Sequence, residues 1–225
     1  MAKITKTEEE QRQQNVAEAV SKTEMFFKEN GKLIYSIVLG VLVIALAILA
    51  YNRFILQPKK VQATDQLVRA ENWFQAGEYE LALNGDENDL GLVDLINKYG
   101  SKAGESVYLY AGIAKLQVGE PEEAIKYLKK YNGKEPIMLA KAQACIGDAY
   151  ADLENYAEAL NWFQKAAKTS DNALSAAYLM KAGIAAEALG ETEKALAFYK
   201  EIKEKWAGAP EGLEIDKYIT RIETK

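Results

Sequence analysis

Residues 140–173, AKAQACIGDAYADLENYAEALNWFQKAAKTSDNA, decide the fold of this chain. Their apolar residues recur at helical spacing in two runs joined by a turn. Gly147 lies inside the first run, where a glycine costs about 1 kcal/mol against alanine, so we expect it to mark a close approach between two helices. The stretch predicts a helical hairpin that needs copies of itself on either side, because it cannot bury both apolar faces alone.

Copies of this pattern flank the stretch. Gly112 lies 35 residues before Gly147 and Gly183 lies 36 residues after it, close to the period of about 34 residues of one helical repeat class. Small and aromatic residues take equivalent places: Tyr108, Ala111, Gly119, Ala124, Leu128 and Pro136 in the earlier copy, Leu179, Ala182, Gly190, Ala195 and Tyr199 in the later one, and Ala70, Trp73, Gly77, Tyr79 and Ala82 in a weaker copy further upstream. This pattern resembles the tetratricopeptide repeat (TPR).

The repeats predict an all-α fold whose second part, residues 57–225, is a TPR-like α-solenoid of about four helical hairpins. We expect the hairpins near 63–99, 105–138, 140–173 and 176–209, followed by a capping helix at 210–223. Gln57-Pro58-Lys59-Lys60 is expected to act as a short breaker before the first hairpin. Asn132-Gly133 with Pro136, and Gly208 with Pro210, are expected to end the second and the last repeats.

An uncharged run, Leu33–Asn52, precedes the repeats. Its 20 residues would span about 30 Å as a helix, which matches the hydrocarbon thickness of a bilayer. A cleaved signal peptide is disfavoured, because the apolar run and the charged segment before it are too long and no A-x-A site follows. The sequence therefore predicts a single transmembrane signal anchor at 33–56. Ser36 and Gly40 form a small-xxx-small pair that could pack against another membrane helix.

Residues 1–32 form a polar N-terminal segment with a partly helical pattern. Two interpretations stay open: a solvated tail, or a short interfacial helix lying on the membrane before the anchor. Basic residues are balanced on the two sides of the anchor, so the positive-inside rule does not decide its orientation.

Composition argues against catalysis. The chain has a net charge of -5, no histidine and one cysteine, Cys145, so the common general base and the Ser-His and Cys-His pairs are missing. We expect no enzyme activity, no cofactor, no metal site, no nucleic-acid partner and no small-molecule substrate. Asp86, Asn88 and Gly91 match the first positions of a calcium loop, but Leu90 and Asn97 break the pattern, so we interpret this insertion as a turn. Cys145 is expected to be a small buried residue rather than a reactive thiol.

In a stack of helical hairpins, the first helices line the concave binding face. Counted from the aligned glycines, this partner groove would be lined by Leu109, Ile113, Leu116, Lys141, Ala144, Asp148, Met180, Ile184 and Glu187. Some of the apolar ones could instead be buried by neighbouring helices. TPR domains that bind a chaperone's C-terminal carboxylate carry lysine and asparagine where this chain has Ala144 and Asp148, so that clamp is absent.

The whole layout resembles the YfgM-like ancillary subunits of the bacterial Sec translocon. The similarity is carried by VSKTEMFFKENGKLI (residues 20–34), ALNGDENDLG (82–91) and EGLEIDKYITRIE (211–223). It implies a single-pass protein of the bacterial inner membrane, with a cytoplasmic N-terminus and a periplasmic TPR domain. It also implies the SecYEG translocon and a membrane-anchored, parvulin-like periplasmic chaperone as partners.

Two other functions are compatible with the same layout. One is a general scaffold or assembly factor of another envelope complex. The other is a mitochondrial-type import receptor with a cytosolic TPR domain, which the missing carboxylate clamp disfavours. All three are protein-binding functions tied to a lipid bilayer.

Overall fold

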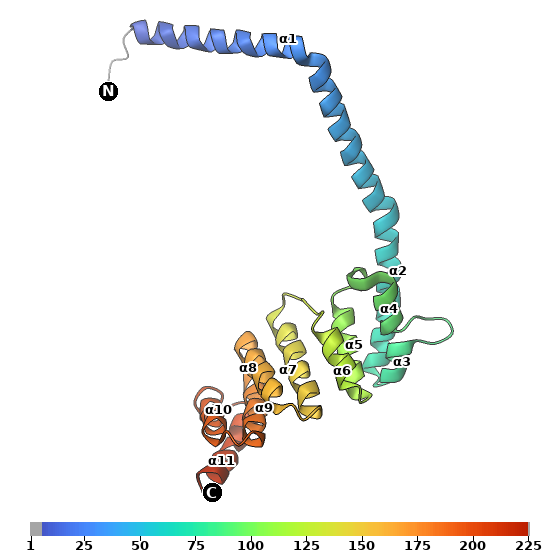
Figure 1. Cartoon of the computed structure of the whole chain (residues 1–225), viewed down its shortest axis with the longest axis vertical. Coiled ribbons are helices and arrows are strands. Elements are labelled where there is room, and N and C mark those ends of the chain that lie inside the picture. Colours follow the sequence, from blue (N-terminus) through green and yellow to red (C-terminus); the bar gives the residue numbers. More distant parts are fainter. Residues whose placement is uncertain (1–5, 225) are drawn as a thin grey trace. The chain divides into compact units, whose positions relative to one another are not determined.

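The structure, a computed structural model, describes residues 6–224 and divides into two compact units, Met1–Pro58 and Lys59–Lys225 (Figure 1). Within the described residues no β-strand forms, and the only extended pairing is an isolated bridge between Gly85 and Leu90. The prediction of an all-α protein is therefore confirmed.

The first unit is one long helix. α1 covers Lys6–Tyr51, and a π-helical turn, η1, continues it over Asn52–Leu56. One helix of the described chain is long and apolar enough to cross a membrane, and the most apolar window of that helix is not buried against protein at all. A polar tail with only partial helix was expected before the apolar run, whereas α1 already begins at Lys6.

The expected breaker at residues 57–60 is wrong. α2 begins at Gln57 and runs to Gln75, directly after η1. Pro58 has no N–H for the carbonyl four residues earlier, and its ring crowds that carbonyl. The preceding turn widens accordingly, and the Gln57 amide bonds to the Asn52 carbonyl, five residues back. The proline therefore changes the helix from α to π geometry for one turn instead of ending it.

The second unit is a row of helices joined by short turns. After α2 come α3 (Tyr79–Asn84), α4 (Leu92–Tyr99), a 3₁₀ turn η2 (Gly100–Ala103), α5 (Ser106–Gln117), α6 (Pro121–Leu128), α7 (Pro136–Asp152), α8 (Tyr156–Ser170), α9 (Leu174–Ala188), α10 (Thr192–Lys205) and α11 (Pro210–Glu223). The pairs α5–α6, α7–α8 and α9–α10 pack as hairpins, and α11 packs on α10 and α9.

A glycine in the first helix of each of these hairpins receives a large side chain from the second. A Cβ on Gly147 would lie 2.6 Å from Phe163 Cε1, and one on Gly112 would lie 2.4 Å from Leu128 Cγ. Gly183 meets Tyr199 in the same way, at 2.2 Å from its Cε1. The predicted close approach at Gly147 is confirmed. The aligned glycines, Gly112 and Gly183, allow the same close approach in the neighbouring hairpins.

The turns within the hairpins share one backbone feature. Gly77, Gly119 and Gly190 have φ between +74° and +81°, and Glu154 takes the equivalent place with φ +56°. Only glycine adopts this left-handed region without steric cost. The third hairpin is therefore strained at Glu154, where its neighbours are relaxed.

Proline positions explain a second wrong expectation. Pro136 was expected to end the second repeat, but it is the first residue of α7. Proline is favoured there, because its missing N–H has no helical partner at that position anyway. The carboxylate of Glu135 accepts a hydrogen bond from the Met138 amide and caps the same helix start.

The insertion between α3 and α4 is a tight turn. The Asp86 carboxylate accepts hydrogen bonds from the amides of Asn88 and Asp89, both at 2.8 Å. Gly85 has φ +74°, and a Cβ there would lie 2.2 Å from the Asp89 carbonyl oxygen. Arg69 of α2 pairs with Asp89 at 2.8 Å. The acidic groups thus stabilise the turn that was expected for this insertion.

Candidate binding surfaces of the repeat unit

The residues predicted to line the partner groove fall into three groups. Leu109 is 1 % exposed and Ala144 is 4 % exposed, so neither can contact a partner in this structure. Ile113, Leu116 and Met180 are half-buried against the core. Lys141 and Ile184 are exposed, Ile184 by 49 %. Leu109 is therefore corrected from groove to core, because neighbouring helices cover that position of the first helix.

The two predicted carboxylates of the groove pair with neighbouring helices, Asp148 with the next hairpin and Glu187 with α11. Asp148 of α7 accepts from the Lys181 ammonium of α9 at 2.7 and 2.8 Å. Glu187 of α9 pairs with Arg221 of α11 and also accepts from the Tyr199 hydroxyl at 2.7 Å. These contacts place both carboxylates of the first-helix face in ion pairs between helices, and leave Ile184 as its most exposed apolar side chain among the predicted residues.

Cys145 lies near the ion pair between Asp148 and Lys181. Burial, with the Asp148 carboxylate nearby, raises the pKa of its thiol to about 11. A thiol with a raised pKa carries almost no thiolate at neutral pH and is a poor nucleophile. This agrees with the expectation that Cys145 is not a reactive thiol, although the side chain is half-buried rather than buried.

The predicted membrane contacts, Ser36 and Gly40, lie on the exposed surface of α1. The Ser36 hydroxyl donates to the Leu33 carbonyl at 2.8 Å, so its polar group is satisfied within the helix. A Cβ on Gly40 would meet nothing within 4 Å. The predicted contact with another membrane helix stays a prediction.

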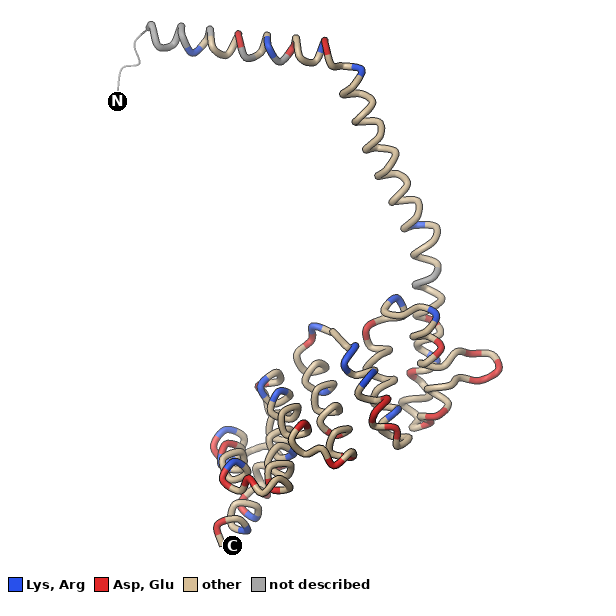
Figure 2. Tube along the Cα trace, viewed as in Figure 1, with Lys and Arg blue, Asp and Glu red and all other residues tan. Residues whose placement is uncertain are grey.

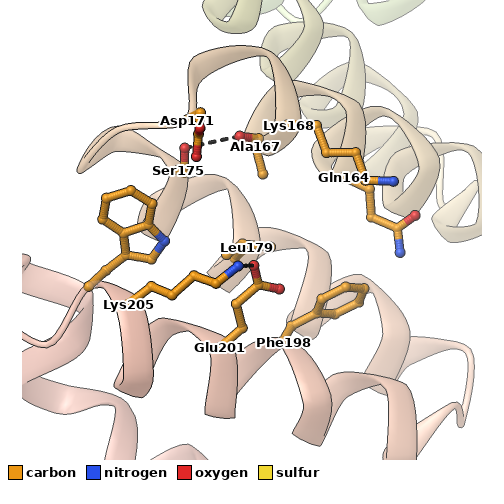
Figure 3. A pocket seen from close by; sticks show the side chains of 10 residues that line it. Gln164, Ala167, Lys168, Asp171, Ser175, Leu179, Phe198, Glu201 and Lys205 are labelled. Atoms are coloured by element: carbon orange, nitrogen blue, oxygen red, sulfur yellow. Dashed lines mark hydrogen bonds and ion pairs between the residues drawn. The ribbon is translucent and has the colours of Figure 1, made fainter.

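Sequence reasoning missed a cavity between α8, α9 and α10, shown in Figure 3. It has a volume of about 430 Å³. Its walls are partly charged and partly aromatic: Gln164, Ala167, Lys168, Asp171, Ser175, Leu179, Phe198, Glu201, Lys205 and Trp206.

Polar groups in this cavity are partly satisfied. The Lys205 ammonium pairs with Glu201 at 2.8 Å, and the Ser175 hydroxyl donates to the Ala167 carbonyl at 3.0 Å. The indole N–H of Trp206 is buried without a hydrogen-bond partner. Repeated lysines and aromatics near the ends of the second helices were the available sequence signal, but helical periodicity does not say that three helix ends enclose a hollow.

No group of three or more histidine, cysteine, aspartate or glutamate side chains could hold a metal ion in the part of the chain that the structure describes. The first-helix face and the cavity present apolar, amide, lysine and carboxylate groups instead. Such surfaces can bind another polypeptide through packing and ion pairs.

The fold that these hairpins define is a TPR-like helical repeat. Two solved structures of MamA, a TPR-like helical repeat protein, resemble the chain in fold. One has 20% sequence identity and a TM-score of 0.50, and covers 69% of this chain and 92% of that chain. The other has 20% identity and a TM-score of 0.52, and covers 72% of this chain and 88% of that chain. Comparison with models of protein families and with curated proteins gave no match.

Proposed function

We propose that this protein is a non-enzymatic, membrane-tethered TPR adaptor and an ancillary subunit of the Sec translocon. It would connect the SecYEG channel to a membrane-anchored periplasmic chaperone of the parvulin-like class, near emerging polypeptides. The observation that carries the proposal is the combination of an apolar helix with no protein cover and a helical repeat unit on one chain. The assignment to the Sec translocon rests in addition on the resemblance of the sequence to the YfgM-like subunits.

The tether supports an adaptor role by raising local concentration. A repeat unit confined to the membrane meets other membrane proteins at a far higher effective concentration than a free one. Ile184 and the half-buried Ile113 and Met180 offer apolar surface for a helix or extended segment. A patch this small binds weakly, so the higher effective concentration from tethering increases its occupancy.

The first experiment is co-purification from gently solubilised membranes. We expect the full chain to recover Sec components and a periplasmic chaperone. Ile184→Lys should weaken that recovery, because it places an unpaired charge in an apolar contact. Leu213→Lys, which changes an exposed leucine of α11 outside the predicted groove, is the matched control. Recovery of other envelope proteins without any Sec component would favour the general scaffold instead.

The second experiment tests the membrane orientation. Single cysteines at Ala2 and at Lys225, both outside the described residues, are introduced in a Cys145→Ala background. The cysteine at Ala2 should resist a membrane-impermeant thiol reagent in intact cells. The one at Lys225 should react once the outer membrane is opened. The opposite labelling pattern would reverse the proposed orientation and remove the periplasmic assignment.

A further inference from the structure

Over the middle hairpins the charges gather on two edges, and Figure 2 shows lysines and carboxylates mainly at different ends of those helices, while both signs are mixed in α10 and α11. The lysine edge is where successive hairpins join: Lys98, Lys102, Lys129, Lys130, Lys134, Lys165 and Lys168. The carboxylate edge holds the turns within the hairpins: Glu78, Glu80, Glu120, Glu122, Glu123, Asp152, Glu154, Glu158, Glu191 and Glu193. Helix dipoles favour this arrangement for the second helices, with acids at their starts and lysines at their ends.

The two edges differ in how far their charges are neutralised. Lys126 and Lys194 pair with Glu123 and Glu191 of the carboxylate edge. None of the lysine-edge lysines makes an ion pair with another described residue. The carboxylates near that edge are fewer: Glu105, Glu135 and Asp171, with Glu201, which pairs with Lys205, in the same cavity as Asp171. Helix dipoles explain where the lysines lie, but not why carboxylates are so few around them.

Aromatic side chains lie among these lysines. The Lys165 ammonium is 4.7 Å from the ring centre of Trp162, and that of Lys129 is 5.9 Å from the same ring. Lys129 also donates to the Tyr150 hydroxyl at 3.1 Å. Trp and Tyr next to lysine are typical of the membrane–water interface, where an apolar ring and a polar tip are both accommodated.

The chain enters the repeat unit at the lysine edge. Leu67 of α2 lies beside Gly104, just before α5, and the ring of Phe74 further along α2 is 5.0 Å from that of Tyr110. α2 and α5 therefore run in the same direction, and Leu67, in the middle of α2, lies level with the start of α5. The apolar helix immediately precedes the start of α2 along the chain.

From these observations we propose that the lysine edge binds the phosphate headgroups of the membrane that holds the apolar helix. This inference rests on the membrane tether of the proposed function. Lysines near an anionic lipid surface contribute about fivefold each to binding. The predicted anchor joins the repeat unit through α2, whose middle lies at this edge. The first-helix face then stays clear of the bilayer for protein partners.

The test uses the full chain reconstituted in bilayers of phosphatidylcholine, with or without about one third phosphatidylglycerol. A fluorophore is attached to a cysteine at Asn132, in the lysine edge, or at Glu193, in the carboxylate edge, each in a Cys145→Ala background. Quenching by spin-labelled headgroups measures contact with the bilayer. Anionic lipid should increase quenching at position 132 but not at 193. Near 1 M salt, where the Debye length is about 3 Å, the effect should vanish.

Two variants with equal charge change separate the lysine edge from general charge. K130Q/K134Q/K168Q removes three unpaired lysines of that edge. It should lower the equilibrium constant for contact between the edge and the anionic bilayer by roughly 100-fold. K126Q/K194Q/K200Q removes three lysines that pair with glutamates, and should leave it unchanged. Circular dichroism checks that both variants keep their helical content.

The outcomes distinguish this inference from the proposed function. The chain could resist carbonate extraction while quenching at position 132 does not change with anionic lipid. The membrane tether would then be supported, but the lysine edge would bind an acidic protein surface, and the lipid assignment would be overturned. Equal loss in both variants would also overturn it. If carbonate removes the chain from the bilayer, the tether of the proposed function is wrong.

Discussion

Gly147→Ala should destabilise the repeat unit, although alanine is the better helix former. The added Cβ would lie 2.6 Å from Cε1 and 2.7 Å from Cδ1 of Phe163, which is itself buried in the core. Overpacking of this kind costs about 1–3 kcal/mol. The gain in helix propensity is about 1 kcal/mol. We expect a net loss of up to about 2 kcal/mol, which lowers the Tm by up to roughly 8 °C for a domain of this size.

Tryptophan fluorescence measures this change cleanly. All three tryptophans, Trp73, Trp162 and Trp206, belong to the repeat unit, so thermal or urea unfolding of the full chain in detergent reports on that unit alone. Phe163→Leu removes the ring edge that the new methyl group meets. In a double-mutant cycle, Gly147→Ala should cost less in the Phe163→Leu background than in the wild type.

Two results would refute this reasoning. If Gly147→Ala raises the Tm, helix propensity dominates and the helices separate easily at this point. If the two substitutions are additive, Phe163 is not the group that the methyl meets, and the close approach between α7 and α8 is misplaced.

Three further predictions use other parts of the repeat unit. Glu154→Gly should raise the free energy of unfolding by about 1 kcal/mol, because glycine adopts φ +56° without strain; an unchanged urea midpoint would contradict this. Gly85→Ala should lower the unfolding midpoint clearly, since its Cβ would lie 2.2 Å from the Asp89 carbonyl oxygen at φ +74°, and wild-type stability would disprove the turn geometry. Cys145 should react slowly with iodoacetamide at neutral pH and faster as the pH rises toward its thiol pKa of about 11, and fast alkylation at pH 7 would show an accessible thiolate.

Cys145 also links stability to pH. Its pKa rises from 9.0 to about 11 on folding, so the unfolded thiol loses its proton first as the pH increases. Its stabilising contribution is complete below pH 9 and is lost between pH 9 and about 11. The fall in stability over this range should be smaller in Cys145→Ala than in the wild type.

The sequence alone was sufficient to predict a structural feature where a residue type has a single physical reason to occur at that position. A glycine inside an apolar helical run predicts a close approach, and Gly147 with Phe163 confirms it. The capping helix expected at 210–223 begins and ends at those residues in the structure. These features depend on local spacing, which a sequence records directly.

The sequence was insufficient where the same residue serves two purposes. Proline can start a helix as well as end one, so Pro136 was assigned to the wrong side of a boundary, and Pro58 lies within a helix that continues. Leu109 shows a related limit: helical spacing gives its side of α5, but not how far the neighbouring helices cover that side. The cavity beside Trp206 depends on three helix ends together, which no single periodic pattern contains.

The buried side chains of the repeat unit form three clusters in a row rather than one central core. Neighbouring clusters meet through shared residues such as Tyr150, which packs against two of them. Under a pulling force, such a row yields at one boundary at a time and refolds there, while a single core yields all at once. A repeat unit held at one end and loaded by a moving polypeptide would therefore act as a soft spring, lengthening in steps of one hairpin without losing the rest of its fold.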